Sequence, residues 1–116
     1  MPTDLDALTR RIRAFATERD WERYHSPKNL AMALSGEAGE LIEQFQWLTE
    51  EQSAALPPDK HEAVRQEMAD VFIYLLRLAD RLGIDLMQAA EDKIDLNEQK
   101  YPVEQVRGSA KKYDED

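Results

Sequence analysis

The 116-residue chain contains no cysteine. Disulfide bonds, thiolate nucleophiles and cysteine-ligated zinc or iron–sulfur centres are therefore excluded. A bound metal would have to be held by oxygen atoms or by the two histidines, His25 and His61. Glycine and proline are scarce, with four and five residues, and no stretch shows the alternation of apolar and polar residues that is typical of β-strands. These absences predict an all-helical (all-α) fold.

Positively charged residues are also few. The sequence has 15 lysines and arginines and 24 aspartates and glutamates, which gives a net charge of -9. This balance argues against binding to nucleic acid polymers or to anionic membranes. No apolar run approaches the roughly 18 residues of a membrane span, and the first residues lack the basic and apolar regions of a signal peptide. We therefore expect a cytoplasmic protein.

Apolar residues recur at helical spacing in four segments of the chain. The first predicted helix runs from about Asp4 to Asp20, with Thr3 or Asp4 as its cap, and the second from a cap at Ser26 to between Trp47 and Glu50. The third runs from after Pro57-Pro58 to Gly83, and the fourth from a cap at Asp85 to before Pro102. Gln88, three residues after Asp85, would complete a capping box there. We expect a four-helix catalytic domain over residues 1–102 and a C-terminal tail, residues 103–116, that is mostly loop.

The third predicted helix is apolar around most of its circumference. Phe72, Ile73 and Leu76 lie outside the main stripe that Val64, Met68 and the following apolar residues form. A helix of this kind must be covered on more than one side, which four short helices cannot easily do. The pattern therefore predicts assembly into a homo-oligomer, either a dimer or a tetramer.

Two pairs of carboxylates fall on or beside apolar stripes. At 100° per residue, Glu37 lies about 20° from Leu30, near the centre of the stripe of the second helix, and Glu40 lies on its flank. Glu67 and Asp70 lie three residues apart on the edge of the third helix's stripe. Burying an ionised carboxylate without a partner costs several kcal/mol, so the sequence must supply a cation near Glu37.

Four oxygen ligands with no histidine at metal-binding spacing are suited to a hard cation such as Mg²⁺ or Mn²⁺. The Glu-x-x-His motif of di-iron bundles is missing. The alternative is that these carboxylates are a solvated acidic surface, as we expect for Glu43, which points away from the stripe. The protein would then be a non-catalytic helical interaction module that binds a basic partner. The position of Glu37 and the second pair on a neighbouring helix favour the metal site.

Other residues indicate a phosphate or a nucleobase. Lys93, Asn97 and Tyr101 are spaced by four on one face of the last helix, where they could bind phosphate groups; packing of Tyr101 and snorkelling of Lys93 are equally compatible with the spacing. Trp47 projects beside Glu40, off the apolar stripe, and is a candidate for stacking on a base. His25, in the loop after the first helix, could reach a base, whereas His61 should be exposed.

Three motifs in order resemble the MazG-like all-helical nucleoside triphosphate pyrophosphohydrolases, and most closely their dCTP pyrophosphatase branch. They are Glu37-Ala38-Gly39-Glu40, Glu67-Met68-Ala69-Asp70-Val71 and the segment from Lys93 to Pro102. Further similarity to that branch lies in Glu18-Arg19-Asp20-Trp21, His25, Pro27-Lys28-Asn29-Leu30, Phe45-Gln46-Trp47 and Arg107-Gly108-Ser109 with Lys112-Tyr113. The resemblance covers nearly the whole chain.

The resemblance implies a nucleotide-pool-sanitising enzyme that cleaves a nucleoside triphosphate, dCTP or a related pyrimidine nucleotide, to monophosphate and pyrophosphate. It implies a catalytic Mg²⁺ site formed by Glu37, Glu40, Glu67 and Asp70. The substrate contacts expected on this basis are Trp21, His25, Trp47, Tyr74, Lys93, Asn97, Tyr101 and Arg107. It also implies dimers or tetramers of helical subunits.

Overall fold

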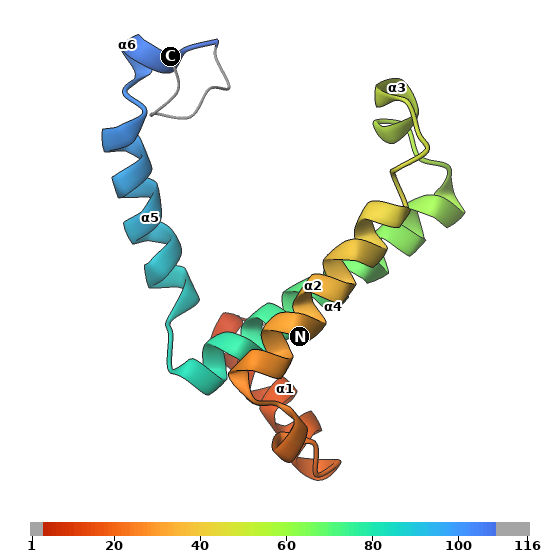
Figure 1. Cartoon of the computed structure of the whole chain (residues 1–116), viewed down its shortest axis with the longest axis vertical. Helices are drawn as coiled ribbons and strands as arrows, with labels where there is room; N and C mark the ends of the chain where they lie inside the picture. The colour runs from red at the N-terminus through yellow and green to blue at the C-terminus, as the bar shows by residue number, and fades with distance from the viewer. Residues whose placement is uncertain (1–3, 109–116) are drawn as a thin grey trace. The chain divides into compact units, whose positions relative to one another are not determined.

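A computed structural model of the chain describes residues 4–108 and confirms the all-helical fold (Figure 1). Across this range no β-strand is present. The elements are α1 (Leu5–Glu18), the 3₁₀ turn η1 (Glu22–Tyr24), α2 (Pro27–Glu43), α3 (Glu50–Ser53), α4 (Pro58–Leu82), α5 (Leu86–Lys100) and α6 (Val103–Val106). The four long helices are those predicted from the apolar periodicity, and α3 and α6 are additional single turns.

The described residues form two compact units, which divide between Gly83 and Ile84. The first contains α1 to α4, and the second contains α5 and α6. The predicted tail begins with one turn of helix, Val103–Val106, rather than with loop, while residues 109–116 lie outside the described range. No helix within residues 4–108 is long and apolar enough to cross a membrane.

The predicted N-caps are present. The Asp4 carboxylate accepts a hydrogen bond from the Ala7 N–H (2.7 Å), and the Ser26 hydroxyl accepts one from Asn29 (3.1 Å). Asp85 accepts a hydrogen bond from the backbone N–H of Gln88. These bonds satisfy N–H groups that have no partner within the helix.

The predicted capping box at Asp85 is only half formed. The Gln88 side chain donates to Asp92 (2.9 Å), one turn further along α5, instead of reaching back to the cap. The reciprocal pair of bonds occurs at α3, where the Thr49 hydroxyl accepts from Gln52 N–H and the Gln52 side chain accepts from Thr49 N–H. Both pairs have the same spacing, so the surroundings of the glutamine decide which bond it makes.

The predicted end of α2, between Trp47 and Glu50, is wrong, because the helix ends at Glu43. Beyond it the backbone bonds tighten: Phe45 N–H donates to the Ile42 carbonyl and Leu48 N–H donates to the Phe45 carbonyl, each three residues back. This tightening is common where a helix terminates. By contrast, α4 ends where predicted, at Gly83, whose φ of 66° is the left-handed conformation that glycine adopts without strain.

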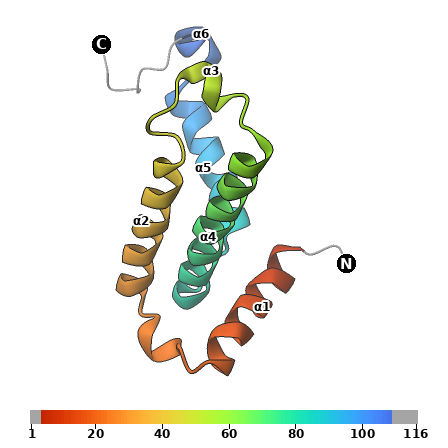
Figure 2. The same ribbon diagram turned by 90° about the vertical axis from the view of Figure 1, so that its right-hand side faces the viewer.

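The core of the first unit lies where α2 packs along α4 in the opposite direction and α1 crosses α4 (Figure 2). Its buried apolar residues are Ala16, Leu30, Val64, Leu76 and Ala79. Leu76 is therefore covered within one chain and does not need a partner subunit, contrary to expectation. Phe72 and Ile73 remain 43% and 39% exposed, so the prediction of an oligomer rests on these two residues.

The link from α1 to η1 is a tight turn. Trp21 N–H donates to the carbonyl of Ala16, and Asp20 N–H donates to the carbonyl of Thr17. This pair of bonds is a Schellman motif, in which the residue after the C-cap is left-handed. Asp20 takes that position with φ of 56°. The turn places Trp21 directly against the end of α1.

Candidate active site

Helices α2 and α4 bring three of the four predicted carboxylates together. One carboxylate oxygen from each of Glu37, Glu67 and Asp70 lies within 4.8 Å of the other two. Glu37 and Glu67 are half-buried, and Asp70 is exposed. Because Glu67 and Asp70 are three residues apart, they share one face of α4, and that face meets α2.

Among the described residues, no hydrogen-bond donor satisfies the buried carboxylate oxygen atoms of this cluster. The Oε2 atoms of Glu37 and Glu67 are buried and have no hydrogen-bond partner among the described residues. Burial, followed by hydrogen bonding with Glu40 and by the nearby charges of Glu40, Asp70 and Glu67, raises the pKa of Glu37 to about 7. Burial also raises the pKa of Glu67, followed by hydrogen bonding with Glu40 and by the charges of Glu40 and Asp70. Buried oxygen atoms that face one another without a donor fit a hard divalent cation.

Glu40 lies within hydrogen-bonding reach of both Glu37 and Glu67, and Glu43 lies near Glu67. Glu40 is exposed, and its charge raises the pKa of both Glu37 and Glu67. Glu43 is exposed as predicted, yet its charge also contributes to the raised pKa of Glu67. The negative field at this end of α4 is therefore stronger than the four predicted ligands alone would produce.

A pocket of about 230 Å³ adjoins the cluster. Its lining residues are Ile12, Phe15, Ala16, Trp21, His25, Asp70, Ile73, Tyr74 and Arg77. Asp70 belongs to both the carboxylate cluster and the pocket wall. Three of the predicted substrate contacts, Trp21, His25 and Tyr74, line the same pocket. The fold thus places aromatic and imidazole rings beside the candidate metal site.

The aromatic side of the pocket is built from α1 and η1. Trp21 packs edge-on against Phe15, with ring centroids 5.7 Å apart, and it is 43% exposed. The His25 ring lies 6.2 Å from Trp21, also in an edge-on arrangement. A partly exposed tryptophan that is held by a second ring offers a surface on which a planar base could stack.

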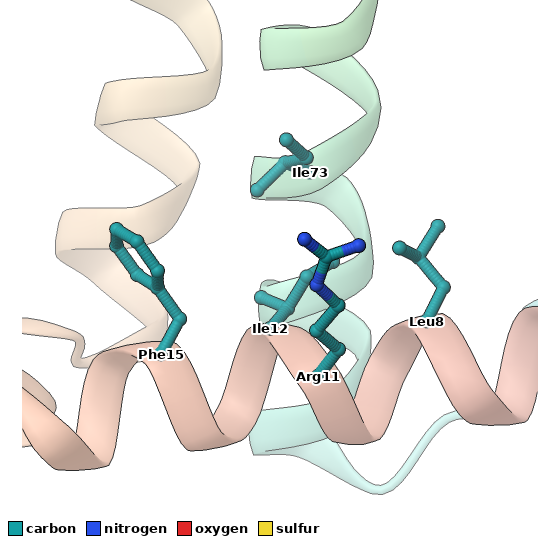
Figure 3. Close-up of a pocket in the computed structure, with 5 residues that line it drawn as sticks. All are labelled: Leu8, Arg11, Ile12, Phe15 and Ile73. Carbon is teal, nitrogen blue, oxygen red and sulfur yellow. The ribbon is translucent and has the colours of Figure 1, made fainter.

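A second, more apolar pocket of about 320 Å³ continues along α1 (Figure 3). It shares Ile12, Phe15 and Ile73 with the first pocket and adds Leu8 and Arg11. In Figure 3, these side chains of α1 project toward α4, which carries Ile73. The two pockets therefore form neighbouring parts of one apolar surface between α1 and α4.

Sequence reasoning missed Arg77, which is buried with 3% exposure in the pocket wall. Its Nη1 donates to Asp80 Oδ2 (3.1 Å), and its Nε donates to His25 Nδ1 (3.3 Å). Asp80 also receives a hydrogen bond from the Nε of Arg13 (2.9 Å). Hydrogen bonding from Arg13, assisted by the charges of both arginines, lowers the pKa of Asp80. The available sequence signal was the helical spacing of seven residues between Asp70 and Arg77.

Of the predicted contacts that lie in the first unit, Trp47 does not line this pocket. Trp47 is 87% exposed and lines neither pocket, so it is not a core residue. Lys93, Asn97, Tyr101 and Arg107 belong to the second unit, and their roles stay predictions. His61 is exposed at the start of α4, as expected.

Known proteins are similar in sequence to the part of the chain that carries the four carboxylates. The family model described as MazG-like matches residues 32–115, a range that includes all four carboxylates. This chain belongs to the MazG-like family. Among solved structures, a pyrophosphatase from Archaeoglobus fulgidus superposes on this MazG-like chain with a TM-score of 0.82 and 38% sequence identity. The match covers 88% of the MazG-like chain and 95% of the archaeal one.

Curated relatives are similar over most of the MazG-like chain. Mouse dCTP pyrophosphatase 1 is 53% identical over 107 residues, which are 90% of this chain and 63% of the mouse protein. Human dCTP pyrophosphatase 1 is 46% identical over 109 residues, 91% of this chain and 64% of the human protein. The MazG-like chain therefore spans a little less than two thirds of the length of these relatives.

Proposed function

We propose that this MazG-like protein is a Mg²⁺-dependent pyrophosphohydrolase that cleaves dCTP, or a related pyrimidine nucleotide, to the monophosphate and pyrophosphate. Its role would be to sanitise the nucleotide pool. The observation that carries the proposal is the junction at Asp70, where an uncompensated carboxylate cluster meets a pocket walled by Trp21, His25 and Tyr74. The names of the mouse and human relatives support dCTP as the substrate.

Glu37, Glu67 and Asp70 would hold the cation, because their oxygen atoms converge and two of them are buried without a donor. A divalent ion at this position would neutralise triphosphate oxygens and favour ionisation of a water molecule. Mn²⁺ could replace Mg²⁺, since both prefer oxygen ligands. Glu40, exposed beside the cluster, would act as a fourth ligand or accept the proton of the attacking water.

The pocket would hold the nucleoside. We propose that the Trp21 ring stacks on the base and that Tyr74, one turn along α4 from Asp70, contacts the nucleotide between base and phosphates. Trp47, Lys93, Asn97, Tyr101 and Arg107 remain proposed contacts. The exposed Phe72 and Ile73 support assembly into a dimer or tetramer.

Pyrophosphate release from each of the four dNTPs tests the proposal. We expect release from dCTP with Mg²⁺, none with EDTA, and loss of release in Glu67→Gln. The matched control is Glu62→Gln, which makes the same change at an exposed position on the same helix and should retain full activity. Failure to release pyrophosphate from any dNTP with Mg²⁺ or Mn²⁺ would refute the proposed function and favour an acidic interaction module.

A further inference from the structure

The two nitrogen atoms of the His25 ring lie in different surroundings. Nδ1 is 3.3 Å from the Nε of Arg77, which is the donor of a hydrogen bond between them. His25 is half-buried and lines the pocket together with Trp21. Since Nδ1 and Nε2 lie on different sides of an imidazole ring, Nε2 is directed away from Arg77.

The chemistry of the pair fixes the position of the imidazole proton. An arginine side chain can only donate hydrogen bonds, so a nitrogen that receives one from it must carry a lone pair. Nδ1 of His25 is therefore unprotonated. A neutral imidazole carries its one proton on the other nitrogen, which leaves Nε2 as an N–H donor.

The surroundings also keep the ring neutral. Burial, followed by the charges of Arg77 and Arg81, lowers the pKa of His25, and the opposing charge of Glu22 is the weakest of these influences. Arg77 is itself held in place, because it is buried and bonded to Asp80, which Arg13 holds from the other side. The donor to Nδ1 is thus part of a network that spans α1 and α4.

We infer that Arg77 is a positioning residue that holds His25 with its proton on Nε2, so that His25 donates a hydrogen bond to an acceptor atom on the edge of the nucleobase. The acceptor would be a carbonyl oxygen or an unprotonated ring nitrogen, both of which cytosine presents. The base-binding part of this inference rests on the proposed function. The tautomer part rests on the hydrogen bond alone.

Nitrogen NMR of the ¹⁵N-labelled protein tests the tautomer directly. His61→Gln leaves His25 as the one histidine, and long-range ¹H–¹⁵N spectra distinguish a protonated from an unprotonated ring nitrogen. We expect protonated Nε2 and unprotonated Nδ1 in this background. A protonated Nδ1 would overturn the inference.

Two substitutions at Arg77 separate the donor from the charge. In Arg77→Gln the side-chain amide nitrogen lies as many bonds from the backbone as the Nε of arginine, whereas Arg77→Met has the same length and no donor. Both variants lose the charge that pairs with Asp80. We expect Arg77→Gln to keep the Nε2–H tautomer and Arg77→Met to show a mixture of both. An unchanged tautomer in Arg77→Met would contradict the role of Arg77.

Kinetics test the consequence for binding. Arg77→Met should raise the KM for dCTP and weaken dCMP binding by about two- to tenfold relative to Arg77→Gln, the range for one hydrogen bond, with a smaller change in kcat. A purely structural role would affect both variants equally. If neither variant folds, His25→Gln and His25→Leu replace them, because glutamine again places a donor at the bond distance of Nε2. Equal KM values within the pair would overturn the inference.

The outcomes also distinguish this inference from the proposed function. If no dNTP yields pyrophosphate, the proposed function and the nucleobase as acceptor both fail, but the spectrum still decides the role of Arg77. If dCTP is hydrolysed and Nδ1 is protonated, the proposed function stands and the role of Arg77 is refuted.

Discussion

The two ends of the polar face of α4 differ in how their charged side chains are paired. At one end, Glu67 and Asp70 meet Glu37 with no positive side chain in the cluster, and two buried oxygen atoms have no partner. At the other end, Asp80 receives hydrogen bonds from Arg77 and Arg13. Both regions are partly buried, so burial alone does not explain the difference.

The difference supports the proposal that the carboxylate end binds a cation. Like charges held together raise the free energy of the folded state unless a cation joins them. Opposite charges held together keep side chains in fixed positions and satisfy most of their hydrogen bonds, although Arg77 Nη2 is also buried without a hydrogen-bond partner. The pocket lies between the two ends and includes Asp70 and Arg77. We therefore expect substitutions at the two ends to produce opposite patterns of activity and stability.

The sharpest contrast should come from Glu37→Gln and Asp70→Asn. Each variant removes a proposed metal ligand, so turnover should fall by at least about 100-fold. Each also relieves repulsion between carboxylates, so the melting temperature of the metal-free protein should hold or rise. Steady-state kinetics with saturating Mg²⁺ and thermal melts in EDTA measure the two effects. Unchanged turnover in either variant would remove that residue from the metal site.

At the paired end, Asp80→Ala should mainly destabilise the protein. It leaves the guanidinium of Arg77, which is 3% exposed, with Glu22 at 3.7 Å as its negatively charged partner beside the His25 ring. Breaking a buried pair costs about 3–5 kcal/mol. The control is Glu62→Ala, which breaks an exposed ion pair with Arg65 and should cost less than about 1 kcal/mol. Urea denaturation compares the two. Equal costs would mean that the paired end does not stabilise the fold.

Between the two ends, Trp21→Leu should weaken nucleotide binding. Loss of stacking is worth about 1–3 kcal/mol, roughly a five- to 150-fold loss of affinity for dCMP. Trp47→Leu provides a comparison of stability. Because Trp47 is 87% exposed, loss of its ring should change the free energy of unfolding by less than about 0.5 kcal/mol. Titration calorimetry and melting curves separate binding from folding. Wild-type affinity in a folded Trp21→Leu protein would show that this ring does not hold the base.

A further expected effect is a pH dependence of the metal-free protein. The pKa of Glu37 is about 7 in the folded state and has an ordinary value of 4.5, so between these values the folded state binds more protons than the unfolded state. Unfolding free energy should therefore fall as pH rises from 4.5 to 7. Urea titrations in EDTA should show this slope, which Glu37→Gln should flatten. A rise in stability over this interval that is equal in both proteins would contradict the assignment.

The paired end should titrate with the opposite sign. Because the pKa of Asp80 is lowered below its ordinary 3.8, its stabilising contribution is present above that pH and is lost as pH falls further. Asp80→Asn should remove this acid-side loss and leave the slope between pH 4.5 and 7 unchanged. In one profile of unfolding free energy against pH, the range from 4.5 to 7 thus reports on the carboxylate end of α4, and the range below 3.8 reports on the Asp80 end.

Local patterns were sufficient to predict much of the first unit. The four long helices, the caps at Asp4 and Ser26, and the stop at Gly83 follow from short-range chemistry that the sequence displays directly. The position of Glu37 relative to Leu30 predicted a buried carboxylate, and in the structure Glu37 is half-buried with its Oε2 atom fully enclosed. In these cases the relevant neighbours lie within a few residues or on the same helical stripe.

Features that depend on distant neighbours could not be predicted. An arginine in an apolar helix ordinarily extends its charge to water, and nothing local indicates that Arg77 meets His25, 52 residues away. The end of α2 depends on small changes in backbone hydrogen bonding that apolar spacing does not encode. Leu76 was assigned to a subunit interface because a helical wheel shows how wide an apolar surface is, but not which element covers it.

The Schellman turn at Asp20 has a consequence for how this chain can vary in length. Its two backbone hydrogen bonds fix the position of Trp21 relative to the end of α1. One inserted residue there would therefore separate Trp21 from Phe15 and move His25 away from Arg77. Ala54 and Ala55, in contrast, are exposed residues of the connection before α4 and line neither the Trp21 pocket nor the carboxylate cluster. Peptide tags, sensor domains or evolutionary insertions should therefore be accepted at Ala54 and rejected at Asp20, which makes the α2–α4 connection the natural point at which to extend the molecule.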